Sequence, residues 1–128
     1  MSDLQSNSRA KLIFDQEELG YDFGPEHPLQ PSRIVALMDL LEVSGLRHIP
    51  EESSSLPLRA ATTEELSLVH TSDYIEAVQS LGSLENVGML DNEHLQLAIK
   101  YGFAEGDTPV LSHMHEVSAR IAGGSLTA

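Results

Sequence analysis

The stretch of residues 108–128 reads TPVLSHMHEVSARIAGGSLTA. It predicts a helix that begins near Thr108 and Pro109 and runs to the end of the sequence. Apolar side chains recur at steps of four, three and four residues and so share one helix face; they are Val110, Met114, Val117 and Ile121. Gly123 and Gly124 each weaken a helix by about 1 kcal/mol relative to alanine. We therefore expect another backbone segment to pack closely against this glycine pair.

Outside this helix, the sequence alternates short periodic segments with turn-rich loops. Apolar spacing and capping residues predict helices over residues 32–46, 62–69, 72–81 and 92–101. Residues with a preference for β-structure predict short strands at residues 10–15 and 58–61. The loop from Gly20 to Pro31 contains two glycines and three prolines. Loops of this length inside compact domains are often functional.

The composition excludes several classes of partner. The 128 residues include 20 acidic and 7 basic side chains, so the net charge is -13, whereas duplex nucleic acid requires a basic surface and anionic membranes attract basic segments. No cysteine is present, which excludes disulfides and thiolate metal sites. We expect no signal peptide and no membrane-spanning segment, and we predict a cytoplasmic protein. Residues 1–9 are polar and are expected to form a disordered N-terminal tail.

The six histidines form no recognisable metal motif. His113 and His115 are the nearest pair, but on a helix they point about 200° apart and cannot share one ion. We expect His115 to face solvent and His113 to flank the core. Glu116 and Arg120 have the spacing of a pair across one helical turn. No nucleophile elbow, phosphate-binding loop or zinc-protease motif occurs, so local chemistry alone does not define an enzyme.

Four further motifs follow one another along the chain. They are YDFGPEHP (21–28) with PSR (31–33), ATTEEL (61–66) with His70 and DYI (73–75), YGF (101–103) with GDTP (106–109), and GGSL (123–126) with Ala128. In this order they resemble the N-terminal third of the zinc-dependent deacetylases. The greatest similarity is to the bacterial acetoin-utilization type, which is related to class II histone deacetylases. The resemblance extends over residues 10–128.

This resemblance implies the arginase/deacetylase fold, an α/β architecture in which helices flank a parallel sheet. We expect residues 10–128 to form the N-terminal portion of such a domain, a truncated and helix-dominated piece with one or two short strands. Part of a sheet without its neighbours exposes an open strand edge and apolar surface. Homo-oligomerisation through that surface is therefore expected.

The resemblance also implies three substrate-binding residues. Asp107 matches the rim aspartate that accepts hydrogen bonds from substrate backbone amides, which suits an ionised carboxylate; its alternative role is to stabilise a helix N-terminus at Thr108. Arg33 matches the arginine near the family's internal acetate channel, and its alternative is to pair with a nearby carboxylate. His27 matches a loop histidine beside the metal site, where its family role is mainly structural. His70 is expected to pack in the core beneath its helix pair.

The family's catalytic residues have no counterpart in this sequence. Its zinc ligands (two aspartates and a histidine), a tandem histidine pair and a carbonyl-polarising tyrosine are expected downstream of GGSL, so no cofactor is expected in this chain. The first hypothesis is an N-terminal deacetylase fragment, inactive alone, that meets an acetylated lysine or amine only when completed. The second is a stand-alone oligomerisation or binding module derived from a deacetylase. The third is a hydrolase with a new site at His113 and His115.

Overall fold

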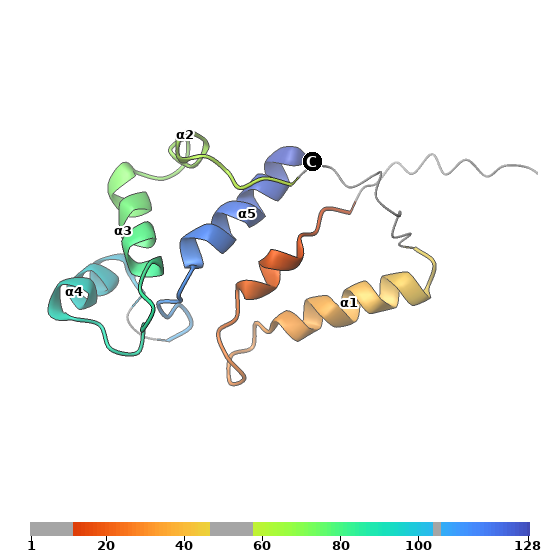
Figure 1. Ribbon diagram of the computed structural model, residues 1–128, viewed down its shortest axis with the longest axis horizontal. Coiled ribbons are helices and arrows are strands. Elements are labelled where there is room, and N and C mark those ends of the chain that lie inside the picture. The colour runs from red at the N-terminus through yellow and green to blue at the C-terminus, as the bar shows by residue number, and fades with distance from the viewer. Residues whose placement is uncertain (1–11, 47–57, 104–105) are drawn as a thin grey trace, which may run out of the picture.

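Six helices and their connecting loops make up the part of the chain that the computed structural model describes, residues 12–46, 58–103 and 106–128. They are the 3-10 helix η1 (Gln16–Gly20) and the α-helices α1 (Pro31–Val43), α2 (Thr63–Leu66), α3 (Ser72–Gly82), α4 (Asn92–Tyr101) and α5 (Met114–Thr127). The main packing pairs are α4 with α3, α3 with α5, α5 with η1, and η1 with α1. Figure 1 shows this order as a row in which α5 lies between α3 and η1.

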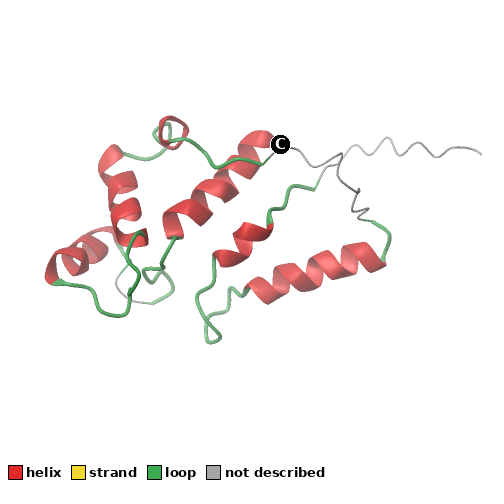
Figure 2. Ribbon diagram, viewed as in Figure 1, coloured by secondary structure: helices red, strands yellow, loops and turns green. Residues whose placement is uncertain are grey.

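The expected strands are absent from the described residues, which Figure 2 shows as helices and loops. Residues 12–15 form no regular structure and lead into η1. Residues 58–61 run along α5, where the Ala61 N–H donates to the Ala119 carbonyl (2.8 Å). A helix carbonyl thus takes the place of a neighbouring strand. Helix-dominated content is confirmed, the predicted strands are wrong for these residues, and the family's parallel sheet is not seen in this part of the chain.

Two predictions lie outside the described residues. The expected tail at residues 1–9 and the first two residues of the expected strand at 10–15 fall in the segment 1–11. The division of the chain into a tail and a deacetylase-like portion therefore stays a prediction. Among the described helices, none is long and apolar enough to cross a membrane.

Capping residues set several helix ends where the sequence places them. The capping box before α2 is complete, because the Glu65 N–H donates to the Thr62 side chain (3.2 Å) and the Thr62 N–H donates to the Glu65 carboxylate (2.8 Å). Gly45 (φ 68°) follows α1 and Gly102 (φ 81°) follows α4, both in the left-handed conformation that glycine adopts without strain. The helix α2 is one turn long, shorter than predicted.

The helix α5 begins later than predicted, at Met114 and not at Thr108. Its preceding loop is fastened to the end of α3, since the His113 N–H donates to the Gly82 carbonyl (2.7 Å). His113 also has a left-handed backbone (φ 62°), which a continuous helix does not allow. A contact between elements, absent from the local sequence pattern, therefore sets this boundary.

The buried face of α5 also differs from the predicted stripe. Met114 and Val117 are buried as predicted, but Ile121 is 41% exposed. Ala119 and Gly123 are buried instead. They are small because the segment 58–61 approaches the helix closely on this side.

Arg120 joins α5 to η1. Its guanidinium contacts the Asp15 carboxylate (Nη1–Oδ2 2.7 Å) and, through Nε, the Glu17 carboxylate. Asp15 also accepts a hydrogen bond from the Glu17 backbone at the start of η1 (3.0 Å). The predicted pairing of Arg120 with Glu116 is therefore wrong, because tertiary packing brings two other carboxylates to the same guanidinium.

The core lies where α3, α4 and α5 meet. Leu81 and Ala98 are fully buried, and Val110 and Met114 join them in one cluster. Partly buried side chains pack around this cluster; they are Val78, Leu84, Val87, Leu90, Leu97, Phe103 and Leu111. Burial of such side chains is the main favourable term in folding, so this half of the row is the more strongly packed.

Gly123 is the point of closest approach between α5 and the segment 58–61. A Cβ atom added there would lie 1.8 Å from the Arg59 carbonyl oxygen and 2.8 Å from the Ala61 nitrogen. Gly124 is also close to its surroundings, with the Ile13 side chain 3.1 Å from an added Cβ. The expectation that another backbone packs against the glycine pair is confirmed at Gly123.

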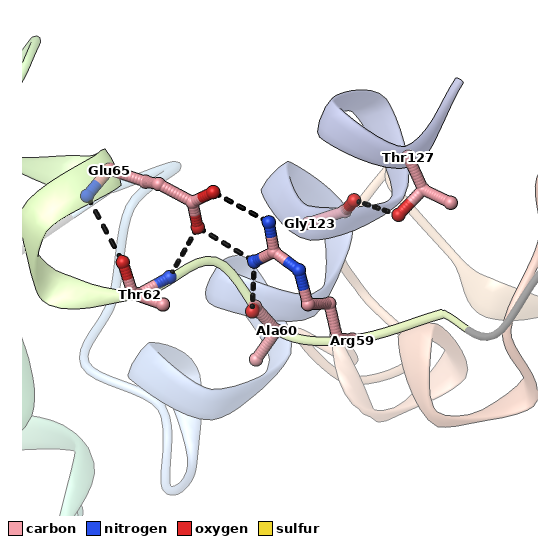
Figure 3. Close-up of polar contacts among 6 residues, drawn as sticks. All are labelled: Arg59, Ala60, Thr62, Glu65, Gly123 and Thr127. Carbon is pink, nitrogen blue, oxygen red and sulfur yellow. Dashed lines mark hydrogen bonds and ion pairs between the residues drawn. The ribbon is translucent and has the colours of Figure 1, made fainter.

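A bidentate ion pair holds the same segment to the start of α2 (Figure 3). Arg59 donates from Nη2 to Glu65 Oε1 (2.6 Å) and from Nη1 to Oε2 (2.7 Å). The Thr62 N–H donates to that carboxylate as well, and Arg59 Nη1 also reaches the Ala60 carbonyl (3.1 Å). The hydrogen bonds from Arg59 and Thr62 lower the pKa of Glu65 to about 2.

The Gly123→Ala variant should be strongly destabilised, because its Cβ would overlap the Arg59 carbonyl. Overpacking of this kind typically costs about 1–3 kcal/mol. Urea unfolding followed by circular dichroism measures the effect. Gly88→Ala is the matched control, since an added Cβ there meets only the Asn86 side chain at 3.5 Å. Equal unfolding midpoints for the two variants would contradict the close approach.

The Arg59–Glu65 pair should make stability depend on pH. Ionised Glu65 has a folded-state pKa of about 2, below its ordinary value of 4.5, so its stabilisation is fully present above pH 4.5 and is lost as the pH falls toward 2. The urea midpoint of Glu65→Gln should therefore lie below that of the unsubstituted chain at pH 5 and approach it near pH 2. Glu64→Gln, one residue away, is the control. A gap between Glu65→Gln and the unsubstituted chain that does not narrow on acidification would argue against the ion pair.

Candidate functional site

Two loops meet at the candidate site. The first runs from Tyr21 to Gln30, between η1 and α1, and the second from Gly106 to His113, between α4 and α5. The His27 ring joins them, with Nε2 lying 3.2 Å from the Asp107 carbonyl oxygen. These two residues are 80 positions apart in the sequence, so the fold brings together two of the three residues predicted to bind substrate.

The hydrogen bonds of His27 define the tautomer of its ring. Nδ1 accepts the Leu29 N–H (3.1 Å), so in the neutral ring the hydrogen resides on Nε2. Nε2 therefore donates to the Asp107 carbonyl. The ring stacks on Phe23 (centroids 4.3 Å apart, planes at 27°), which in turn meets Tyr21 edge-on. His27 is thus fixed by one hydrogen bond at each ring nitrogen and by one aromatic face.

Asp107 presents an exposed side chain on the second loop. No helix begins beside it, since α5 starts at Met114. The alternative that Asp107 stabilises a helix N-terminus is therefore wrong. The loop is ordered by other contacts: the Thr108 hydroxyl donates to the Gly102 carbonyl (2.7 Å), in addition to the His27 bond.

Arg33 lies in the first turn of α1 and is exposed. Its guanidinium donates from Nη1 to the Pro28 carbonyl (3.4 Å), within the first loop. The alternative role of Arg33, an ion pair with a nearby carboxylate, is not observed among the described residues. Gln30 adds a second bond inside this loop, donating from its side chain to the Pro25 carbonyl. Arg33 thus supports the loop that holds His27 without contacting Asp107.

A pocket of about 190 Å³ opens between η1, α3 and α5. Its lining includes Tyr21, His70, Tyr74, Phe103 and His115. The predictions for both histidines are wrong. His115, expected in solvent, is half-buried, and its Nε2 lies 3.3 Å from Gln79 Nε2. His70, expected in the core, is exposed next to the Tyr74 ring. His113, expected beside the core, is exposed.

Sequence reasoning missed this pocket, although one of its lining residues has a local signature. Phe103 directly follows the left-handed Gly102, and its N–H donates to the Ala98 carbonyl (2.8 Å). In this type of helix ending the residue after glycine often packs back on the helix. The other lining residues come together only through the packing of separate elements.

The described residues contain no group of three or more histidine, aspartate or glutamate side chains that could hold a metal ion. The residues in this part of the chain therefore do not fit the zinc that the family resemblance implies. Tetrahedral zinc sites in enzymes use three protein ligands and one open position.

The histone deacetylase domain model matches residues 27–128, so the chain belongs to the histone deacetylase family. Its relatives include three proteins named acetoin utilization protein AcuC. The chain is 39% identical to that of Bacillus subtilis (strain 168) over 117 residues, 32% identical to that of Staphylococcus aureus (strain MSSA476) over 123, and 34% identical to that of Staphylococcus xylosus over 127.

These matches cover most of this chain but a small part of each relative. They include 91%, 96% and 98% of the chain, and 28%, 29% and 30% of the three relatives in the same order. The chain thus spans less than a third of the length of the AcuC proteins that it matches. No solved structure matches it.

Proposed function

We propose that this chain supplies the substrate rim of a zinc-dependent deacetylase of the acetoin-utilization type, which hydrolyses acetylated lysine or acetylated amines. The observation that supports this proposal is the bond between His27 and the Asp107 loop, which joins the two rim loops identified by resemblance. The protein would act in the cytoplasm. Disulfides are rare in that compartment, and this sequence contains no cysteine with which to form one.

Asp107 is the proposed anchor for the substrate. Its exposed carboxylate, on a loop held by backbone contacts, is available to accept two amide hydrogen bonds from a substrate backbone. Arg33 would bind the acetate product, because a guanidinium has five N–H donors and the Pro28 carbonyl takes one of them. His27 would belong to the same rim through its bond to Asp107.

The chemistry itself would require residues of the kind that the AcuC relatives contain outside the matched part. The family's zinc ligands, tandem histidines and polarising tyrosine match no motif in this sequence. We therefore propose that the chain is inactive alone. Zinc would be bound by residues of the kind found in the unmatched part of the AcuC relatives. When bound, zinc would supply the activated water of the reaction.

A second candidate function is a self-associating module. The helix α1 packs mainly on η1 and leaves large apolar side chains in solvent, with Leu37 50%, Leu40 62% and Val43 88% exposed. A helix that is apolar on several faces normally has a partner on each of them. A second copy of the chain could cover this face, giving the homo-oligomer expected from the sequence.

The chain should hydrolyse an acetyl-lysine peptide only when combined with the remaining part of a relative. We expect no turnover by the zinc-supplemented chain, and turnover when it is mixed with the portion of the Bacillus subtilis AcuC that it does not match. Asp107→Ala should then lower kcat/KM by about 100-fold, since charge-assisted hydrogen bonds are worth about 1.5–3 kcal/mol.

The exposed Asp39→Ala on α1 serves as the control for that measurement. Equal activity of the two variants would contradict the anchoring role of Asp107. Turnover by the chain alone would contradict its proposed inactivity.

Self-association should be visible by sedimentation velocity at about 50 μM. We expect a dimer that dissociates in Leu40→Glu, because a buried unpaired charge is strongly unfavourable. Asp39→Asn, an adjacent exposed position, should leave the dimer intact. A monomeric unsubstituted chain at this concentration would eliminate the second candidate function.

A further inference from the structure

We infer that His27 is a positioning residue that fixes the Asp107 carboxylate for substrate, and does not bind substrate itself. This inference rests on the proposed rim function. It assigns His27 a specific atom-level task, in which Nε2–H holds the Asp107 carbonyl while Nδ1 holds the loop on which His27 sits.

The bond from His27 to the Asp107 carbonyl connects two parts of the fold. Three hydrogen bonds tie the second loop to the α3–α4 side of the row, through the Gly102, Leu84 and Gly82 carbonyls, and two more join it to the start of α5. His27 comes from the opposite side, between η1 and α1. Among the described hydrogen bonds, the one from His27 links the first loop to the second. It therefore sets the distance between the two sides of the rim.

Histidine suits this position because it combines an acceptor and a donor on one rigid ring. The Leu29 N–H occupies Nδ1, and the Asp107 carbonyl occupies Nε2. Stacking on Phe23 restricts rotation of the ring. With both nitrogens engaged, the ring has no free polar atom with which to contact a substrate, which separates its role from that of Asp107.

Two conservative substitutions test the Nδ1 and Nε2 hydrogen bonds of His27 separately. Glutamine places an amide donor at the reach of Nε2, whereas asparagine places a carbonyl acceptor at the position of Nδ1 and cannot reach Asp107. If His27 positions the second loop, His27→Gln should preserve the order of that loop and His27→Asn should not. If His27 merely shapes its own loop, neither substitution should change the order of the second loop, and only His27→Gln should disturb the first.

The test is NMR on the isotope-labelled 128-residue chain. Two-bond nitrogen–hydrogen correlations should place the His27 hydrogen on Nε2. In His27→Asn, amide exchange at His113, whose N–H bonds to Gly82, should be about fivefold faster, equivalent to the loss of about 1 kcal/mol from one hydrogen bond. His27→Gln should stay within twofold of the unsubstituted chain, and the Leu29 region should be perturbed in it instead.

Exchange in His27→Asn that equals the unsubstituted chain, or exchange in His27→Gln as fast as in His27→Asn, would overturn the inference. A variant that loses helical circular dichroism is replaced by His27→Phe, which keeps the stacking on Phe23 and should show the fivefold change. These readouts need no substrate. Failure of the rim function would appear only as equal activity of Asp107→Ala and Asp39→Ala, so the two failures are distinguishable.

Discussion

The close approach of the Arg59–Ala61 backbone to α5 at Gly123 ties the middle of the chain to its last helix. A Cβ at this position would overlap the Arg59 carbonyl, so only glycine allows the segment to lie against the helix. In that position the Ala61 N–H reaches the Ala119 carbonyl and the Arg59 guanidinium reaches Glu65. The segment that leads into α2 is thereby held against α5.

Local signals in the sequence identified the features whose causes are local. The ends of α3 and α4 and the capping box at Thr62 depend on residues a few positions apart. The start of α5 and the partners of Arg120 depend on contacts between distant elements. Sequence reasoning placed α5 too early for this reason. At residues 58–61 it expected a strand, but the partner of this segment is a helix.

The candidate site shows the same division. The motifs include both loops that meet at the candidate site, and the family match begins at His27. The contact that joins the loops could not be predicted, because it depends on how η1 and α5 pack. The expected orientations of His70 and His115 were wrong for a related reason: both residues line a pocket that forms only where separate elements pack together. Residue identity thus indicated the family, and packing determined which of its residues meet.

The row-like arrangement in Figure 1 has a consequence for how the molecule opens. The helix α1 is attached mainly through η1, and Arg120 fastens η1 to α5, whereas α3, α4 and α5 share the one buried cluster. Local unfolding separates a protein into cooperative units according to such differences in burial. The η1–α1 arm can therefore detach as one unit while the three-helix core stays folded. Detachment of that unit would separate His27 from the Asp107 carbonyl while the second loop stays bonded to Gly82 and Leu84.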